Sequence, residues 1–146
     1  MSISTNIEIE NKLEELLKVA RFTQEFSVTN NLSIDCLSAL NLSLEECLTN
    51  TMKYGYSDSS LHKINVELWI DKYSVRVRIT DDGLMFNPFI SHVPKLDVGI
   101  NEQNIGGLGV HLVKNIMDSY QYFRIENKNI ILLTKHQTKN WSDNDS

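Results

Sequence analysis

Hydrophobic and polar residues alternate along five short stretches of the chain, and this period of two is typical of strands that bury one face. The predicted strands cover residues 6–10, 64–70, 73–79, 122–126 and 130–134. Asp71-Lys72 favours a turn between the second and third strands, which predicts an antiparallel hairpin. A second turn is predicted at Asn127-Lys128-Asn129, residue types that tolerate positive φ.

Three other stretches repeat hydrophobic residues at helical spacing. Asn11 with Glu14 three residues later predicts the start of a helix that runs to about Ser27. Ser33 predicts the cap of a second helix, which ends near Tyr54-Gly55, and a third helix is predicted over residues 110–120. Because the strands bury only one face, we expect the helices to cover that face. The predicted class is α+β, with helices on one side of the sheet.

Composition and charge restrict the class of protein further. The 146 residues carry 41% hydrophobic and 23% charged side chains, which suits one domain over residues 1–136 with a polar tail at 137–146. A net charge of −5 argues against direct binding of nucleic acid. No apolar run is long enough for a membrane span, and the start does not resemble a secretory signal, so we expect a cytoplasmic protein with Cys36 and Cys47 reduced in the core.

A long segment without periodicity, residues 81–109, ends in Gly106-Gly107-Leu108-Gly109 directly before the third predicted helix. Backbone N–H groups of such a loop can approach an anion closely, and the helix dipole favours negative charge there. Phosphate is the obvious candidate. A flexible hinge with a helix cap explains the glycines equally well.

At the start of the same segment, Asp81-Asp82-Gly83 follows a predicted strand. Asp and Gly both favour turns, which is the simpler interpretation. A carboxylate held at a strand end can also accept a hydrogen bond from an exocyclic amine such as that of adenine. Gly83 would then let the base lie against backbone.

On the second predicted helix, Glu46, Asn50 and Lys53 fall together on a polar face. This face could simply be solvated. However, an amide oxygen can hold Mg²⁺ against phosphates while a nearby carboxylate orients an attacking hydroxyl. Lys53 could meet a phosphate as a point charge.

In order and spacing, Glu46-Cys-Leu-Thr-Asn50, Asp81-Asp-Gly83 with Phe86-Asn-Pro88, and Gly106-Gly-Leu-Gly109 resemble the nucleotide-binding boxes of the GHKL ATPases. Within that superfamily, LEECLTNTMKYGY and GGLGVHLVKNIMD are similar to the bacterial anti-sigma factor serine/threonine kinases. The resemblance implies a two-layer α/β sandwich of the Bergerat type, with a mixed, mostly antiparallel sheet and an ATP lid.

The resemblance also implies roles for individual residues. Glu46 would be the general base, Asn50 the Mg²⁺ ligand and Asp81 the acceptor for the adenine amine. The other ATP-binding residues implied are Lys53, Gly83, Phe86, Gly106, Gly107, Leu108, Gly109 and Val110. The last hairpin of the family usually carries Gly-Thr where this chain has Asn127-Lys128-Asn129, so Asn129 is a candidate substitute for that threonine.

The resemblance implies partners as well: an anti-anti-sigma (STAS) protein as phosphoryl acceptor, an RNA polymerase sigma factor, and a second copy of the chain in a homodimer. One alternative is a binding module in which ATP orders the lid without phosphoryl transfer. A detached histidine-kinase catalytic domain and an ATPase that acts as a conformational clock also stay open.

Overall fold

The computed structural model describes residues 3–90 and 110–137, in which five strands form one sheet. The strands are β1 (Ile3–Glu10), β2 (Lys63–Ile70), β3 (Ser74–Asp81), β4 (Ser119–Ile125) and β5 (Lys128–His136). They lie in the order β1-β2-β3-β5-β4. All pairings between these strands are antiparallel, so the described sheet lacks the parallel pair that a mixed sheet would contain.

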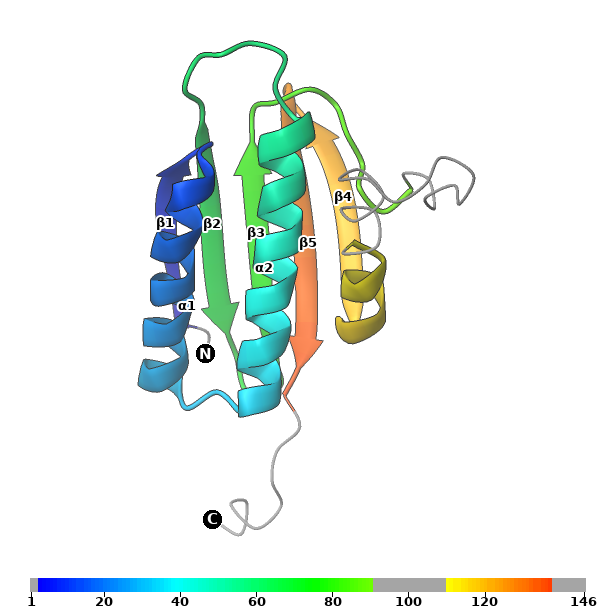
Figure 1. Cartoon of the computed structure of the whole chain (residues 1–146). Helices are drawn as coiled ribbons and strands as arrows, with labels where there is room; N and C mark the ends of the chain where they lie inside the picture. Colours follow the sequence, from blue (N-terminus) through cyan, green and yellow to red (C-terminus); the bar gives the residue numbers. More distant parts are fainter. Residues whose placement is uncertain (1–2, 91–109, 138–146) are drawn as a thin grey trace, which may run out of the picture.

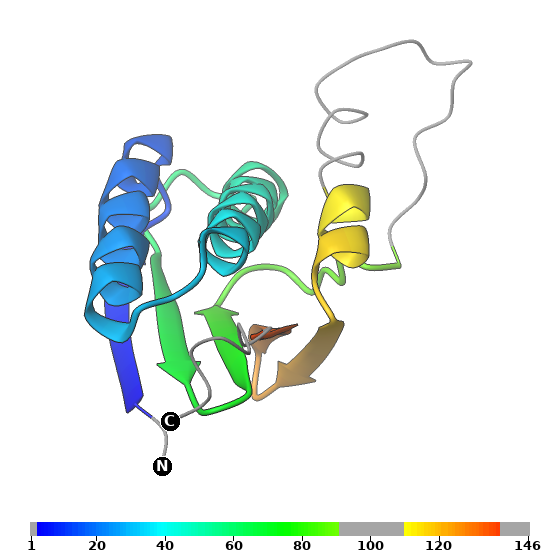
Figure 2. The same cartoon turned by 90° about the horizontal axis from the view of Figure 1, so that it is seen from below.

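The helices cover one face of this sheet, as Figures 1 and 2 show. A 3-10 turn, η1 (Leu13–Glu15), leads into α1 (Leu16–Asn30), which is followed by α2 (Ile34–Tyr54). Residues 110–116 form a short third helix near β4. The α+β class and the two-layer sandwich are therefore confirmed. Within the described ranges, none of the helices has the length and apolar character needed to span a membrane.

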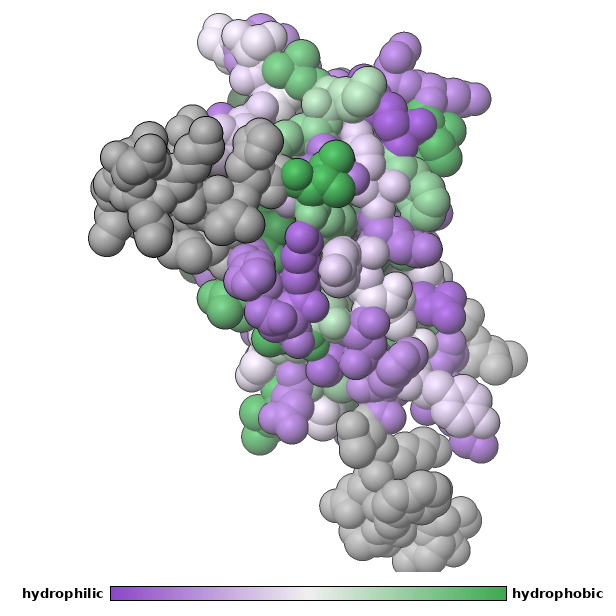
Figure 3. Space-filling model, turned by 90° about the vertical axis from the view of Figure 1, so that its right-hand side faces the viewer, coloured by the Kyte–Doolittle hydropathy of each residue, from purple (hydrophilic) through white to green (hydrophobic). Residues whose placement is uncertain are grey.

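The hydrophobic core lies between α2 and the central strands. Ile64, Val66 and Leu68 of β2 are fully buried, and they belong to one cluster with Leu44 and Leu48 of α2. Residues between them on β2 are only half-buried, as expected for strands with one face on the core. Seen from the β4 side, hydrophobic residues are scattered among hydrophilic ones (Figure 3).

The two predicted helix starts have different outcomes. Ser33 Oγ accepts a hydrogen bond from the Cys36 N–H at 3.1 Å, which confirms the cap of α2. The prediction for Asn11 was wrong, because its Oδ1 accepts instead from the backbone N–H of His62 at 2.9 Å. Glu15, one residue beyond the predicted acid, accepts from the N–H of Glu10. Asn11 therefore ties the segment between β1 and η1 to the segment before β2.

The third predicted helix is shorter than expected, and β4 starts correspondingly earlier. Helical structure stops at residue 116, whereas the prediction extended it to residue 120. The backbone N–H of Asp118 donates to the Thr134 carbonyl at 2.9 Å, and the Lys135 ammonium donates to the Ile116 carbonyl at 2.8 Å. These contacts with β5 end the helix and draw the chain into the sheet.

The β4–β5 turn also differs from its prediction. Positive φ occurs at Glu126 (50°) and Asn127 (64°), as a two-residue hairpin turn of type I′ requires. Asn129 is consequently part of β5, where it pairs with Asp81 of β3. The shift of the turn by one residue places an amide beside the aspartate at the end of β3.

Candidate nucleotide-binding site

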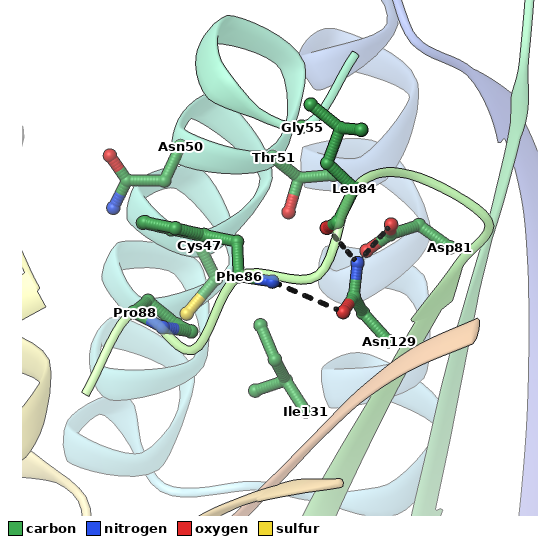
Figure 4. Close-up of a pocket in the computed structure, with 10 residues that line it drawn as sticks. All are labelled: Cys47, Asn50, Thr51, Gly55, Asp81, Leu84, Phe86, Pro88, Asn129 and Ile131. Atoms are coloured by element: carbon green, nitrogen blue, oxygen red, sulfur yellow. Dashed lines mark hydrogen bonds between the residues drawn. The ribbon is translucent and has the colours of Figure 1, made fainter. Parts of the chain in front are cut away.

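A pocket lies between α2 and the ends of β3 and β5 (Figure 4). The chain segment that follows β3 closes its outer side. Its cavity volume is only about 10 Å³, which is room for about one water. Its lining residues are Cys47, Asn50, Thr51, Gly55, Asp81, Leu84, Phe86, Pro88, Asn129 and Ile131.

Asp81 is the charged residue that lines this pocket, and it is only 4% exposed. It reaches the pocket because it is the last residue of β3, on the buried face of the alternating strand. Its Oδ1 accepts hydrogen bonds from the Gly83 N–H at 2.8 Å and from Asn129 Nδ2 at 3.0 Å. Burial raises the pKa of Asp81, and these two hydrogen bonds oppose that rise.

Gly83 is buried where the end of α2 approaches the end of β3. A Cβ at this position would lie 2.4 Å from the carbonyl oxygen of Gly55, and that same oxygen accepts a hydrogen bond from the Leu84 N–H at 2.7 Å. The sequence suggested that Gly83 makes room for a base. In the structure the space above Gly83 is occupied by backbone, so glycine is required for the contact between two chain segments.

The hydroxyl of Tyr56 is buried near the carboxylates of Asp81 and Asp82. Among the described residues it has no hydrogen-bond partner. The pKa of Tyr56 is raised chiefly by burial, with further contributions from the charges of Asp81 and Asp82. A buried hydroxyl of this kind is a donor that a water or a bound molecule can satisfy.

The other wall of the pocket is α2, and here the predicted polar face was wrong in part. Asn50 is only 5% exposed and lines the pocket together with Cys47 and Thr51, so it is not on a solvated face. The segment that follows β3 passes over this side of α2 and buries all three side chains (Figure 4). Burial raises the pKa of the Cys47 thiol to about 12, so the thiol stays protonated at neutral pH.

Glu46 lies one helical turn before Asn50 and is half-buried, outside the lining of the pocket. Desolvation raises the pKa of its carboxyl, the neighbouring charge of Glu45 adds to the rise, and Lys53 opposes it. Lys53 itself is exposed. The structure thus confirms that α2 carries this acid, this amide and this amine, but only the amide enters the pocket.

The remaining predicted residues have varied positions. Phe86 lines the pocket, and its ring centroid is 6.5 Å from that of Tyr54. Val110 belongs to the hydrophobic core and is 4% exposed, so its side chain is not available to a ligand. Gly106, Gly107, Leu108 and Gly109 lie outside the described residues.

Several lining residues were not proposed from the sequence: Cys47, Thr51, Gly55, Leu84, Pro88 and Ile131. Helical spacing carries a signal for some of them, because Cys47, Asn50 and Thr51 recur at intervals of three and four residues. Ile131 follows from strand alternation, two residues after Asn129 on β5. Leu84 and Pro88 have no periodic signal, since they belong to an irregular segment.

Comparison with known protein families identifies the class. The model of the histidine kinase-like ATPase domain matches residues 9–135, and the chain belongs to this family. The match includes both walls of the pocket, and the fold is the one that the family implies.

Similar curated proteins include kinases and an anti-sigma factor. The serine-protein kinase RsbW of Listeria monocytogenes is 26% identical over 104 residues, which cover 68% of this chain and 66% of the relative. The anti-sigma F factor of Oceanobacillus iheyensis is 24% identical over 140 residues, which cover 95% of this chain and 93% of the relative. These similarities support membership of an anti-sigma kinase family.

A solved structure shares the fold. It contains the RsbU and RsbW domains of a Mycobacterium tuberculosis protein, with a TM-score of 0.66 and 11% sequence identity. The match covers 94% of this chain and 33% of that longer chain. At this identity the likeness concerns the fold alone.

Proposed function

We propose that this chain is an ATP-dependent serine/threonine protein kinase of the anti-sigma type, which phosphorylates an anti-anti-sigma (STAS) protein and sequesters a sigma factor. The observation that carries the proposal is the arrangement of α2 against the pocket. Asn50 lines one side of a pocket whose other side ends in Asp81, and Glu46 lies one turn away along the same helix. Figure 4 shows Asn50 and Asp81 on opposite sides.

In this proposal the adenine lies at the Asp81 side of the pocket and the phosphates extend past Asn50. Asp81 accepts a hydrogen bond from the adenine amine. Gly106 to Gly109 would contact the phosphates through their backbone N–H groups, and Lys53 would contribute a positive charge. The names of the kinase relatives and the ATPase family support ATP as the nucleotide.

Glu46 would act as the general base of the transfer. The acceptor hydroxyl oxygen bonds to the γ-phosphorus, the bond from that phosphorus to the ADP oxygen breaks, and the hydroxyl proton passes to the Glu46 carboxylate. The pKa of Glu46 is raised by its partial burial, which makes the carboxylate a better proton acceptor than a fully solvated glutamate. Activity should therefore require pH above this pKa.

The residues present are compatible with Mg²⁺ as a companion of ATP. Mg²⁺ prefers oxygen ligands and usually keeps several waters, so one protein oxygen plus phosphates is enough. The Asn50 amide at the pocket wall would provide that oxygen. In the described part of the chain no cluster of three His, Cys, Asp or Glu side chains offers a separate metal site.

The test is transfer of labelled phosphate from Mg-ATP to the STAS protein encoded nearest this gene. Glu46→Gln should keep ATP affinity and lower transfer about 10²–10⁴-fold, the usual effect of losing a general base. Glu45→Gln is the matched control, because it removes the same charge from the exposed neighbouring position. It should transfer at the wild-type rate at a pH well above the pKa of Glu46, which the Glu45 charge helps to raise. Equal transfer by Glu46→Gln and wild type would contradict the assignment.

A second outcome would support a different function. If the wild type binds ATP and no acceptor becomes labelled, while a protein partner binds only in the presence of ATP, the chain is a nucleotide-gated binding module. The raised pKa of Glu46 would then have no catalytic meaning.

We also propose a homodimer that uses the edge of β1, which pairs only with β2 in the described sheet, together with the first helix. This strand is at the end of the sheet, and its backbone can pair with another strand. Ile3 at its start is 55% exposed. Sedimentation that shows only monomer at micromolar concentration would exclude this arrangement.

A further inference from the structure

Asn129 is the polar residue that connects Asp81 to the rest of the pocket. Its side chain is 4% exposed and lies opposite Asp81 in the β3–β5 pairing. Its Nδ2 donates to Asp81 Oδ1 at 3.0 Å and to the Leu84 carbonyl at 2.8 Å (Figure 4). One amide group thus joins the end of β3, the segment after it and β5.

The orientation of this amide is determined by its other contacts. Asn129 Oδ1 accepts from the Tyr122 hydroxyl at 2.5 Å and from Arg124 Nη1 at 3.1 Å. A guanidinium has only donors, so the amide oxygen must face Arg124 and the amide NH₂ must face Asp81. Arg124 Nη1 also donates to the Gly83 carbonyl at 2.8 Å, which holds the guanidinium in place.

These contacts give the two oxygens of Asp81 different roles. Both donors to this carboxylate, Asn129 Nδ2 and the Gly83 N–H, bind Oδ1. Within residues 3–90 and 110–137, nothing donates to Oδ2. Hydrogen bonds to a carboxylate favour its ionised form, and here the one from Asn129 is the largest effect that opposes burial.

We propose that Asn129 is a positioning residue for nucleobase selection: it keeps Asp81 as an ionised acceptor with Oδ2 left for the base, so the pocket selects 6-amino purines over 6-oxo purines. This proposal rests on the proposed binding of ATP in this pocket. An exocyclic amine donates to Oδ2, whereas the oxygen of a 6-oxo purine is repelled by it. A protonated Asp81 would lose this discrimination, because its O–H could donate to that oxygen.

The test is calorimetric titration of the full chain with Mg-ATP and Mg-GTP between pH 5 and 8. Asn129→Leu keeps the approximate shape of the side chain and removes the donor. We expect the ratio of ATP to GTP affinity to fall roughly 10- to 100-fold, the effect of losing a hydrogen bond to a charged group. The pH below which ATP affinity is lost should move upward, because Asp81 protonates more easily without this donor.

Tyr122→Phe is the matched control. It removes one of the donors to the amide oxygen of Asn129. The Arg124 guanidinium still orients this amide and the donor to Asp81 stays in place, so both the affinity ratio and the pH profile should stay as in wild type. If Asn129→Leu does not fold, Asn129→Ser replaces it, since its shorter side chain cannot span the same contacts. The serine variant should change the ratio in the same direction, and a ratio equal to that of Tyr122→Phe would overturn the proposal.

The outcomes separate this proposal from the proposed function. A purely structural role predicts that Asn129→Leu weakens ATP and GTP equally without moving the pH profile, which would overturn the positioning role. Wild type that binds ATP and GTP equally would overturn the selectivity alone and leave the kinase proposal intact. Wild type that binds neither nucleotide would overturn both.

Discussion

The two sides of the pocket are built in different ways. On the sheet side, Asp81, Asn129 and Gly83 come from paired strand ends and the segment beside them, and hydrogen bonds hold each of them. On the helix side the lining residue Asn50 is buried, whereas Glu46 is half-buried and Lys53 is exposed, both outside the lining. Neither of these two side chains has a hydrogen bond within the described part of the chain. Hydrogen bonds therefore order the polar groups of the sheet side, whereas the acid and the amine on α2 are not ordered in this way by the described residues.

This contrast suggests a division of work in the proposed kinase. Rigid donors and acceptors recognise a base at low entropic cost, because they are ordered before the ligand arrives. A carboxylate that must meet two different molecules, nucleotide and acceptor protein, gains from access to solvent. We therefore expect binding and transfer to respond to different substitutions.

The largest expected difference in ATP affinity is between the variants Asp81→Asn and Glu46→Gln. Asp81→Asn replaces a charged acceptor with a neutral amide and places an NH₂ group near the Asn129 donor, so ATP affinity should fall roughly 10- to 100-fold. Glu46→Gln should leave that affinity unchanged. Calorimetric titration with Mg-ATP measures the affinity of both variants. Equal losses of ATP affinity would show that the sheet side and the helix side do not have separate roles in binding and transfer.

The next largest effect is a loss of stability at the contact between Gly83 and Gly55, which joins the sheet side to the end of α2. Gly83→Ala places a Cβ 2.4 Å from the Gly55 carbonyl oxygen, which is backbone and can move only with the end of α2. The unfolding free energy should fall by about 1–3 kcal/mol, the usual cost of overpacking a close contact. Urea denaturation measures this change. Met85→Ala, two residues away and 73% exposed in wild type, should change the unfolding free energy little.

The periodic parts of the fold could be predicted from the sequence, and the contacts between distant segments could not. The β2–β3 hairpin and the Ser33 cap depend on neighbours in sequence, and both are confirmed. The end of the third helix depends on Lys135 and Thr134 of β5, which the local pattern does not include. Leu112, Ile116 and Tyr120 have helical spacing, but tertiary hydrogen bonds override it beyond residue 116.

The site follows the same rule. Asp81 could be placed from the sequence because strand alternation puts the last residue of β3 on the buried face. The burial of Asn50 could not, since it results from a segment more than thirty residues later that crosses α2. The contact between Asn129 and Asp81 could not be predicted either, because the predicted β4–β5 turn was displaced by one residue. Such a shift reverses which side chains face the core.

The smallest expected effect is a pH-dependent change in stability at His62. It tests whether charged contacts also order the residues next to the sheet side of the pocket. His62, before β2, has Nε2 2.9 Å from Asp58 Oδ1 and Nδ1 3.1 Å from Asp82 Oδ1, and its ring stacks on Tyr56 with centroids 4.4 Å apart. The hydrogen bond to Asp58 is the main cause that raises the pKa of His62. Both ring nitrogens can donate to these carboxylates only when the imidazole is protonated.

A raised pKa in the folded state fixes the sign of the pH dependence. The stabilisation is fully present below the unfolded pKa of about 6.5 and is lost as pH rises through the higher folded pKa. The loss of unfolding free energy in His62→Gln should therefore be larger at pH 6 than at pH 9, as measured by urea denaturation. His136→Gln, at an exposed position on β5, is the control for the removal of an imidazole elsewhere in the protein. If the loss of unfolding free energy in His62→Gln is the same at both pH values, the ring stabilises the fold only through its stacking on Tyr56. In that case the charge of His62 does not help to order the segment beside Asp81.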